Sequence, residues 1–460
     1  MSAPALTDEV VRTAAGVADA WTALRRRTGQ VPGVQSAVRL RGRLLSSTAH
    51  GWADVAAGTA LGTHHVFRVA SHSKTFTATA VLRLAERGLL RLDDPLAAHV
   101  PWVGRECAEL GRASLRELLG HAAGVTRDGT AGDFWQLLEP FPDTAGLRAA
   151  VSAGGALLPR SQRFKYSNVG YALLGAVVEA VTGTPYGEHV RRELVEPLGL
   201  ARTAPDLDGV AEPADLVTGY SGLATADERE PLPTAATGAM AAATGFCSTA
   251  EDLTAWFCAH AAGAEGPLSE HSRRLAQRAE WPTADPAAGG DERAYGLGFI
   301  VERHGQRTLV GHSGGFPGQI TKSVLDPASG LAVSVLTNCV DGPAAELALG
   351  TAGLVDLVAA SWSEARAAAD PAPFTGRWQS LWGVLDVVRC GSALLALDPA
   401  RPDPAAHPVR LRALDERRLL VTADGGFGSP GETWELGRDG DGAPVLRAAS
   451  GVTMRPPAAR

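Results

Sequence analysis

Apolar and polar residues follow two different periods in the N-terminal part of the chain. Residues 7–27 place apolar side chains at helical spacing. Two runs with a strand pattern follow, Val34–Leu40 and Leu44–Trp52, and Arg41-Gly42-Arg43 between them predicts a hairpin. The chain is therefore expected to begin with a helix and a pair of antiparallel strands.

A second helix is predicted to begin at Ser71 and to stop at Gly88. Its apolar stripe consists of Val81, Leu82, Leu84 and Ala85. From about residue 95 to 270 the pattern is mostly helix and loop, with frequent Gly and Pro. This stretch predicts a helical subdomain inserted between the edges of a sheet.

Strand patterns return in the second half of the chain. They cover Gly296–Glu302, Thr308–Val310, Ile320–Leu325 and Leu331–Thr337. An Ala- and Leu-rich helix, roughly 343–368, follows them. Two strands before the helical subdomain and four after it predict one mainly antiparallel sheet with helices on its faces. The expected fold class is mixed α/β, of the α+β kind.

The C-terminal part has a different period. Ala367–Pro373 is typical of a linker, and short β runs follow it, separated by turn signals such as Asp424-Gly425-Gly426. The runs are Leu385–Val388, Ala393–Leu397, Leu411–Leu414, Leu419–Ala423 and Trp434–Leu436. We therefore expect a large domain over residues 1–368, a linker at 369–373 and a small all-β domain at 374–460.

Composition narrows the function classes. The net charge is −7 and no long basic run occurs, which argues against a nucleic-acid surface. The five cysteines are scattered and form no C-x-x-C pair, so neither a disulfide framework nor a zinc site is indicated. Asp8 and Glu9 stand where a signal peptide needs positive charge, and no uninterrupted apolar run reaches membrane-spanning length. We expect a cytoplasmic protein without a membrane span.

Lysine is rare in this chain, and that makes one motif informative. Only three lysines occur among 43 basic residues, and Lys74 stands three residues after Ser71. A lysine ammonium can lose its proton when it is buried, whereas an arginine guanidinium cannot. Side chains three residues apart share one face of a helix. A neutral Lys74 could therefore take the proton of the Ser71 hydroxyl, which makes a nucleophilic serine enzyme the leading hypothesis.

Two further motifs accompany this pair. Lys165-Tyr166-Ser167-Asn168 precedes an apolar helix from Val169 to Val181 and places a phenol and an amide at a loop–helix junction. Gly311-His312-Ser313-Gly314-Gly315 lies between strand patterns, where small residues would let a substrate approach the backbone. In this order and spacing the motifs resemble the serine β-lactamase and penicillin-binding-protein superfamily, in particular its class C-like branch of hydrolases and esterases.

The resemblance extends over roughly residues 30–365 and beyond the three motifs. Val69–Thr75 and Gly88–Pro95 look like the nucleophile helix and its exit, and Leu118–Val125 and Gly245–Leu253 look like recurrent structural segments. The run opening at Phe374 is similar to the lipocalin-like domain often appended to such hydrolases.

The resemblance implies a role for each matching residue. Ser71 would be the nucleophile, Lys74 its general base, and Tyr166 a partner in proton transfer. Asn168 would hold Lys74 and the substrate amide, and the backbone N–H groups of Ser71 and Gly315 would form the oxyanion hole. His312, Ser313 and Gly314 would contact the substrate. No cofactor and no metal are implied.

One residue departs from the pattern of the penicillin-targeted branch. Those relatives have Lys-Thr-Gly or Lys-Ser-Gly where this chain has His312-Ser313-Gly314. A histidine is mostly neutral at pH 7 and binds an anion more weakly than lysine does. This substitution favours an esterase, amidase, D-aminopeptidase or acyl-transfer role over a dedicated β-lactamase or carboxypeptidase.

Other interpretations of these motifs remain to be weighed. Gly311–Gly315 also fits the G-x-S-x-G elbow of α/β-hydrolases, but that elbow needs a helix after the serine, and Phe316-Pro317-Gly318 and a strand pattern follow instead. Tyr166 and Asn168 could form a turn and a helix cap. His72 is expected to point away from the site. Structural rather than catalytic roles are expected for His64, His65 and His121.

The resulting expectation is a serine hydrolase that forms a Ser71 acyl-enzyme on a small-molecule or peptide ester or amide. One alternative is a thioesterase or transacylase of the penicillin-binding-protein type, which would release or cyclise a peptide and would need a carrier protein as partner. A second alternative is a non-catalytic β-lactam or peptide sensor.

Overall fold

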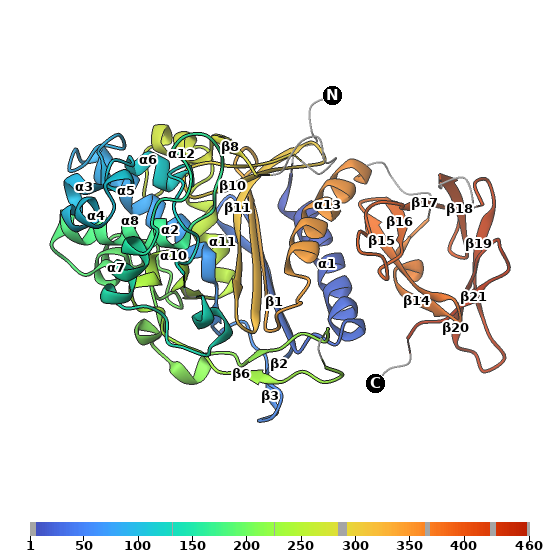
Figure 1. The fold of residues 1–460 in the computed structure, drawn as a ribbon. Coiled ribbons are helices and arrows are strands. Elements are labelled where there is room, and N and C mark those ends of the chain that lie inside the picture. Colours follow the sequence, from blue (N-terminus) through green and yellow to red (C-terminus); the bar gives the residue numbers. More distant parts are fainter. Residues whose placement is uncertain are drawn as a thin grey trace. The chain divides into compact units, whose positions relative to one another are not determined.

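The computed structural model describes residues 6–130, 132–224, 226–283, 292–363, 369–423 and 429–457. The chain divides into two units (Figure 1). The larger unit comprises Val31–Ala345, and the smaller combines Met1–Gln30 with Glu346–Arg460. The domain limits expected from the sequence, with a linker at 369–373, stay a prediction.

Among its described residues, the larger unit is built on a nine-stranded antiparallel sheet in the order β3-β2-β1-β13-β12-β11-β10-β9-β8. The strands are β1 (Gly33–Leu40), β2 (Arg43–Asp54), β3 (Thr59–Ala60), β8 (Trp281–Pro282), β9 (Arg293–Tyr295), β10 (Ile300–His304), β11 (Arg307–Phe316), β12 (Gln319–Asp326) and β13 (Leu331–Thr337). β1 pairs with β13 in the register Val34↔Thr337. The predicted antiparallel sheet, with strands from before and after the helical subdomain, is thereby confirmed. The edge strands β3, β8 and β9 were not expected, because runs of two or three residues show no period.

In the described part of this unit, two antiparallel pairs of short strands lie outside the sheet. They are β4 (Phe67–Arg68) with β7 (Cys247–Ser248), and β5 (Gly219–Tyr220) with β6 (Pro231–Leu232). The first pair joins the segment that leads into Ser71 to a segment within the helical subdomain.

The helical subdomain expected at 95–270 is present. Its α-helices are α3 (Leu96–His99), α4 (Pro101–Glu106), α5 (Ala108–Gly111), α6 (Leu115–Leu119), α7 (Thr144–Ser152), α8 (Asn168–Thr182), α9 (Tyr186–Val190), α10 (Ala241–Thr244) and α11 (Ala250–Cys258), with α12 (Glu270–Gln277) at its end. Shorter helical turns are η2 (Asp133–Gln136), η3 (Arg191–Val195), η4 (Leu207–Gly209), η5 (Pro213–Asp215) and η6 (Gly238–Met240). α11 contacts β1, β12 and β13, and so covers one face of the sheet.

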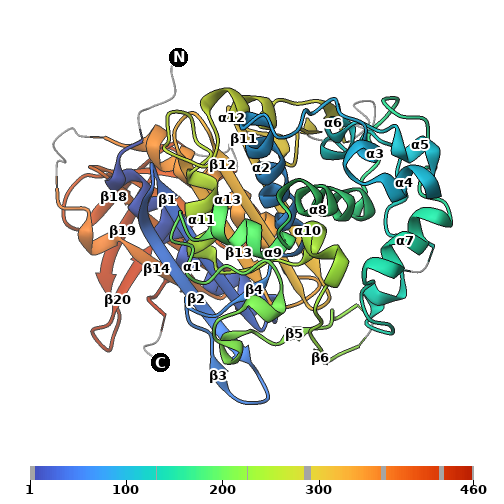
Figure 2. The same cartoon turned by 90° about the vertical axis from the view of Figure 1, so that its left-hand side faces the viewer.

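The helix α2 (Ser73–Glu86) runs through the core between the sheet and the helical subdomain. It contacts α8 and α10, which also contact each other (Figure 2). Every residue from Ser73 to Leu82 is buried, so the helix has no solvent face near its N-terminus. Phe76 packs between two aromatic rings, with ring centroids 4.2 Å from Phe246 and 3.8 Å from Trp256. This stack fixes the first turns of α2.

Replacing Phe76 by alanine is expected to lower the free energy of unfolding of the larger unit by about 3–5 kcal/mol, because a fully buried ring and two stacking contacts are lost. Urea unfolding followed by tryptophan fluorescence measures the loss. Leu89→Ala, at a side chain that is 54% exposed, is the matched control and should change stability by less than about 0.5 kcal/mol. Equal stabilities of the two variants would contradict the packing argument.

The smaller unit combines two helices with an all-β barrel. The helices are α1 (Asp8–Thr28) and α13 (Ala344–Ser361). They lie against each other at Gly350, where a Cβ would come within 2.4 Å of the Trp21 ring, and Arg25 forms an ion pair of 2.7 Å with Glu346. A glycine at position 350 therefore permits the close approach.

Within residues 369–423 and 429–457, the barrel has eight antiparallel strands in chain order. They are β14 (Gly376–Ser380), β15 (Gly383–Cys390), β16 (Ala393–Leu397), β17 (Val409–Ala413), β18 (Arg418–Ala423), β19 (Thr433–Arg438), β20 (Pro444–Arg447) and β21 (Thr453–Met454). Two hydrogen bonds between Gln379 and Arg455 join the first strand to the segment after the last one. Leu394, Leu419 and Leu446 are fully buried in its core. The predicted all-β domain is confirmed, as a nearly closed barrel.

Some predicted segments fall partly or wholly outside the described residues. The helix expected at 343–368 is described to Ser361, and residues 364–368 lie outside the described ranges, as do the first two residues of the Ala367–Pro373 linker. The predicted turn at Asp424-Gly425-Gly426 lies outside them too. Within the described part of the linker, η8 (Ala372–Phe374) forms a short helical turn.

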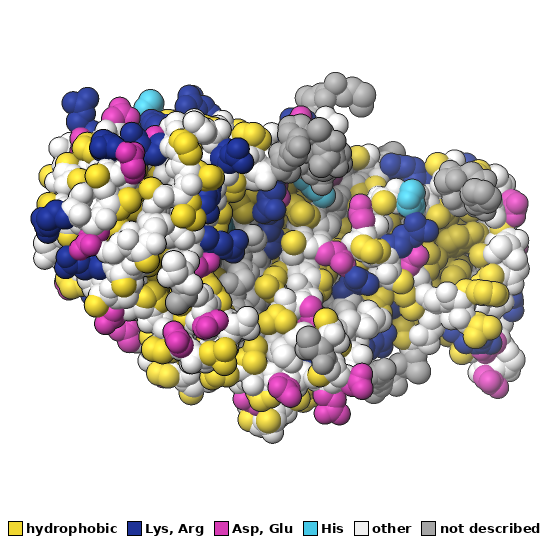
Figure 3. Space-filling model, in the orientation of Figure 1, with side chains coloured by type: hydrophobic (Ala, Val, Ile, Leu, Met, Phe, Trp, Pro, Cys, Tyr) yellow, Lys and Arg dark blue, Asp and Glu magenta, His cyan; other side chains and the backbone are white. Residues whose placement is uncertain are grey.

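α13 also qualifies the expectation that no membrane span occurs. By length and composition alone it could cross a membrane, but 61% of it is buried in this structure, which is typical of a core helix. On the face seen in Figure 3, basic and acidic side chains are interspersed.

Candidate active site

Ser71 lies in a tight turn that precedes α2. The turn is the short helix η1 (Ala70–His72), so α2 begins at Ser73 rather than at Ser71. Ala70 has a φ of 45°, in the left-handed region that non-glycine residues rarely adopt. Hydrogen bonds from the His72 backbone N–H to the Val69 carbonyl (3.1 Å) and from Ser73 Oγ to the Ala70 carbonyl (2.5 Å) hold it there. The backbone that carries Ser71 is therefore fixed.

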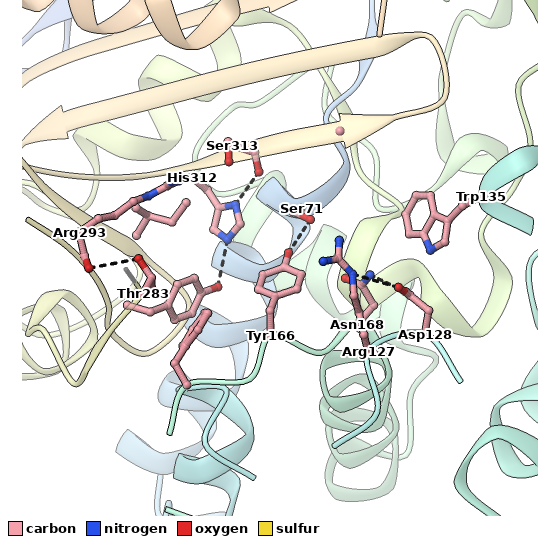
Figure 4. A pocket seen from close by; sticks show the side chains of 14 residues that line it. Ser71, Arg127, Asp128, Trp135, Tyr166, Asn168, Thr283, Arg293, His312 and Ser313 are labelled. Carbon is pink, nitrogen blue, oxygen red and sulfur yellow. Dashed lines mark hydrogen bonds and ion pairs between the residues drawn. The ribbon is translucent and has the colours of Figure 1, made fainter. Parts of the chain in front are cut away.

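The Ser71 hydroxyl lies within hydrogen-bond distance of two side chains that the sequence singled out. Lys74 Nζ is 3.1 Å from Ser71 Oγ, and the Tyr166 hydroxyl donates a hydrogen bond of 2.7 Å to the same oxygen (Figure 4). The first contact follows from the three-residue spacing on η1 and α2. The second joins residues 95 apart in the sequence.

Lys74 is buried completely, and its amine is held on three sides. Besides Ser71 Oγ, it contacts Asn168 Oδ1 at 2.8 Å and the Ala243 carbonyl at 2.7 Å. Burial lowers the pKa of Lys74 well below its usual value, a nearby Asp128 carboxylate raises it, and Arg127 lowers it. A neutral amine has two N–H donors and one lone pair. Asn168 and Ala243 can accept both donors, which leaves the lone pair for the Ser71 hydroxyl.

Tyr166 is half-buried at the pocket wall, and desolvation of its phenol raises its pKa above the usual value. Its ring packs 4.4 Å from that of His121, centroid to centroid, and Lys74 Nζ lies 4.8 Å from the centre of its ring. His121 Nδ1 accepts a hydrogen bond from the Ser167 backbone N–H at 3.1 Å. His121 thus packs against the Tyr166 ring and binds the backbone next to it, which agrees with the structural role expected for this histidine.

Asn168 is the first residue of α8, and Ser167 is its cap. Ser167 Oγ accepts a hydrogen bond from the Gly170 backbone N–H at 2.8 Å, so the capping role considered for Asn168 belongs to its neighbour. The Asn168 side chain is free to point at Lys74 and is 3% exposed. Because Ser167 caps the helix, the Asn168 amide is available to contact Lys74.

The strand β11 contributes the third motif. His312 is buried, with Nε2 accepting from the Tyr295 hydroxyl at 3.0 Å and Nδ1–H donating to the Ser313 carbonyl at 2.6 Å. Burial lowers the pKa of His312 well below its usual value, with smaller contributions from Lys74 and His72. A neutral ring with both nitrogens engaged does not supply a cation for a substrate anion.

The glycines of this motif differ in position. Gly315 is exposed and lines the pocket together with Ser313. Gly314 instead packs against the nucleophile turn, where a Cβ would come within 2.2 Å of the Val69 carbonyl. The small residue at position 314 therefore makes room for the backbone before Ser71, whereas the expectation was room for a substrate.

A pocket of about 440 Å³ opens over Ser71 (Figure 4). Ser71 and Tyr166 lie in its middle, His312 and Arg293 to one side, and Asp128 and Trp135 to the other. The described residues that line it are Ser71, Arg127, Asp128, Trp135, Phe164, Tyr166, Asn168, Thr283, Arg293, Tyr295, Ile300, His312, Ser313 and Gly315. Sequence reasoning did not find Arg127, Asp128 or Tyr295, which stand in no motif.

The structure also places His72 and Ser313, two other residues discussed from the sequence. His72 is fully buried beneath the turn, where Nε2 lies 3.0 Å from Ser323 Oγ and Nδ1 lies 2.9 Å from the Val69 carbonyl. Ser313 sits within β11, which continues to Phe316 and turns into the strand β12. A nucleophile elbow needs a helix at that point, so the geometry does not fit it.

Comparisons with known sequences agree with this geometry. The family model described as beta-lactamase matches residues 13–355. Penicillin-binding protein 4 of Amycolatopsis lactamdurans is 34% identical over 178 residues, which cover 38% of this chain and 45% of that protein. The chain therefore spans less than half the length of this curated relative.

Solved structures are similar over a larger share of the chain. The octameric penicillin-binding protein homologue from Pyrococcus abyssi has a TM-score of 0.65 at 21% identity and covers 96% of this chain and 100% of its own. SurE has a TM-score of 0.63 at 26% identity and covers 98% and 100%.

The D-amino acid amidase from Ochrobactrum anthropi SV3, solved with L-phenylalanine amide, has a TM-score of 0.61 at 24% identity and covers 75% of this chain and 96% of its own. Solved hydrolases thus share the fold around Ser71, and a family model spans most of the sequence. The chain belongs to the beta-lactamase family.

Proposed function

We propose that the protein hydrolyses an ester or amide through an acyl-enzyme on Ser71. One observation carries the proposal: Ser71 Oγ lies 3.1 Å from the buried Lys74 amine and 2.7 Å from the Tyr166 hydroxyl. A hydroxyl between a base and an acid is the arrangement that nucleophilic catalysis requires.

The first step is the attack of Ser71 Oγ on the substrate carbonyl carbon. The neutral Lys74 amine takes the hydroxyl proton and becomes an ammonium while the carbon–oxygen bond forms. Asn168 Oδ1 and the Ala243 carbonyl stabilise this ammonium, because both are acceptors at 2.8 Å and 2.7 Å. The oxyanion lies toward the backbone N–H groups of Ser71 and Gly315, which line the same pocket.

The second step expels the leaving group. Tyr166 donates its phenol proton to the leaving nitrogen or oxygen and recovers a proton from the Lys74 ammonium. The raised pKa of the phenol keeps Tyr166 protonated until that moment. Water then attacks the acyl-enzyme, gives its proton to the same pair, and releases the acid and Ser71.

The chemistry of the acyl group is the open part of the proposal. His312 is neutral, which disfavours a substrate carboxylate on that strand. The fold is shared with an amidase of D-amino acids, and SurE was solved with D-Leu. These likenesses support D-amino acid amides and esters as the first compounds to test.

The test combines labelling with a substrate screen. A fluorophosphonate probe is expected to add one phosphonyl group to the tryptic peptide that contains Ser71, located by mass spectrometry. A parallel screen of p-nitrophenyl esters, D-amino acid amides and peptidyl thioesters follows product release. Labelling at another residue, or no labelling with any probe, would overturn the proposal.

A second candidate is acyl transfer to an amine in place of water, as in a penicillin-binding-protein-type thioesterase acting on a carrier-bound peptide. It is favoured by the absence of a dedicated water-activating carboxylate among the described lining residues, because Asp128 is engaged on both oxygens. A peptidyl thioester with a free amine distinguishes the two: a macrocycle supports transfer and a free acid supports hydrolysis. A sensor role predicts a single burst without steady product release.

A further inference from the structure

The loop Thr126–Asp128 lies directly on the start of α8, the helix that carries Asn168. Ser167 Oγ donates to the Thr126 carbonyl at 2.6 Å. The backbone N–H groups of Asn168 and Val169 both donate to the Arg127 carbonyl, at 2.8 Å and 3.1 Å. The backbone of the loop is therefore fixed to the start of the helix by three hydrogen bonds, all accepted by loop carbonyls.

The Asp128 carboxylate continues this contact to the catalytic side chains. Its Oδ1 accepts from Asn168 Nδ2 at 2.7 Å, and its Oδ2 accepts from Arg127 Nε at 3.1 Å. Asn168 in turn contacts Lys74 through Oδ1 at 2.8 Å. We propose that Asp128 is a positioning residue that holds the Asn168 amide in one orientation and sets the charge next to the Lys74 amine. This inference rests on the proposed function of Ser71 and Lys74.

The orientation of the Asn168 amide matters because its two ends have opposite chemistry. The oxygen accepts a hydrogen bond from Lys74, whereas the NH2 group would repel the ammonium that forms during acylation. Asn168 is 3% exposed, so water cannot supply the hydrogen bonds that a reversed amide would lose. A carboxylate opposite the NH2 group favours the productive orientation, since it has no donor of its own when ionised.

Asp128 is also the negative charge that acts on Lys74. Its carboxylate raises the pKa of Lys74, against the larger lowering by burial and the lowering by Arg127. The other titratable side chains near Lys74 are His121, Tyr166, Tyr171 and His312. Burial lowers the pKa of both histidines and raises the pKa of both tyrosines, so all four are neutral near pH 7. Asp128 and Arg127 are therefore the charged groups that shift the pKa of the Lys74 amine.

The sign of the expected pH effect follows from these charges. Acylation needs the neutral amine, so the rate falls as the pH decreases through the pKa of Lys74. Asp128→Asn removes a negative charge, which lowers that pKa and should move the acid limb to lower pH by about one pH unit. Arg127→Gln removes a positive charge and should move the limb to higher pH.

The experiment measures the rate of fluorophosphonate labelling of Ser71 against pH for the full-length protein and its variants. Asp128→Ala, which also removes the acceptor for Asn168, should lower the rate at the optimum by roughly 10- to 100-fold. Asp128→Asn can still accept from Asn168 through its oxygen and should lose less than Asp128→Ala. Asp133→Asn, at an exposed carboxylate five residues further along, is the matched charge control and should leave the profile in place.

The outcomes separate this inference from the proposed function. Labelling of the wild-type protein at a residue other than Ser71 would overturn the proposed function itself. Labelling at Ser71 with unchanged rates and pH limbs in both Asp128 variants would overturn only the positioning role. Equal shifts for Asp128→Asn and Asp133→Asn would also overturn it, because the effect would then be one of general surface charge. Thermal unfolding identifies a variant that fails to fold, and Asp128→Asn keeps the test valid if Asp128→Ala does so.

Discussion

Replacing Ser71 by alanine is expected to lower ester and amide hydrolysis by about 10⁴- to 10⁶-fold, and the remaining rate would come from substrate binding and the oxyanion hole. The loss is this large because the proposed acyl-enzyme cannot form, and Lys74 and Tyr166 then have no oxygen to act on. The change deletes one partly buried oxygen at the surface of a pocket, so the thermal unfolding midpoint should move by only a few degrees. Steady-state rates with a p-nitrophenyl ester, together with intact mass after fluorophosphonate treatment, measure both effects.

Ser313→Ala is the informative comparison, because Ser313 lines the same pocket and belongs to the G-x-S-x-G pattern. This variant should still acquire the probe at Ser71, even if its rate decreases. The opposite pattern, with labelling kept in Ser71→Ala and lost in Ser313→Ala, would transfer the nucleophile to β11. The two variants therefore decide between the two serine motifs of the sequence.

The parts of the site that the sequence predicts are those with a local signal. Ser71 and Lys74 meet because they are three residues apart on one turn and helix. Tyr166 and Asn168 were assigned to the site because the three motifs occur in the order seen in the resembling family. Helical spacing alone would not have brought them to Ser71. The strands of the central sheet were found for a similar reason, since β1, β12 and β13 are long enough to show their burial patterns.

The parts that the sequence does not predict depend on contacts between distant segments. Asp128 reaches Asn168 across 40 residues and stands in a loop without a periodic pattern. Gly314 illustrates a second limit, because a glycine in a strand signals a close approach without saying what approaches. The scarcity of lysine alone did not identify which of the three lysines is catalytic. Lys322 is almost as buried as Lys74, yet it forms an ion pair with Glu302 and is not among the described residues that line the pocket.

Substituting Lys74 by arginine is expected to reduce the acylation rate by about 10³-fold or more, although the positive charge is retained. A guanidinium does not lose its proton in this pH range, so it cannot accept the proton of Ser71. It is also larger than an amine in a space that is completely closed around Lys74. Rates of p-nitrophenyl ester hydrolysis and of fluorophosphonate labelling from about pH 5 to pH 10 measure the effect.

Lys74→Met separates the two possible roles of this residue, because methionine has similar length but neither a charge nor a proton-accepting nitrogen. If Lys74 acts as the base, both variants are equally slow and both lose the acid limb that the wild-type protein shows. If Lys74 acted only as a fixed cation, Lys74→Arg would keep a large part of the activity and Lys74→Met would not. The lowered pKa of the buried amine favours the first result, because it favours the neutral form of Lys74, which can accept a proton.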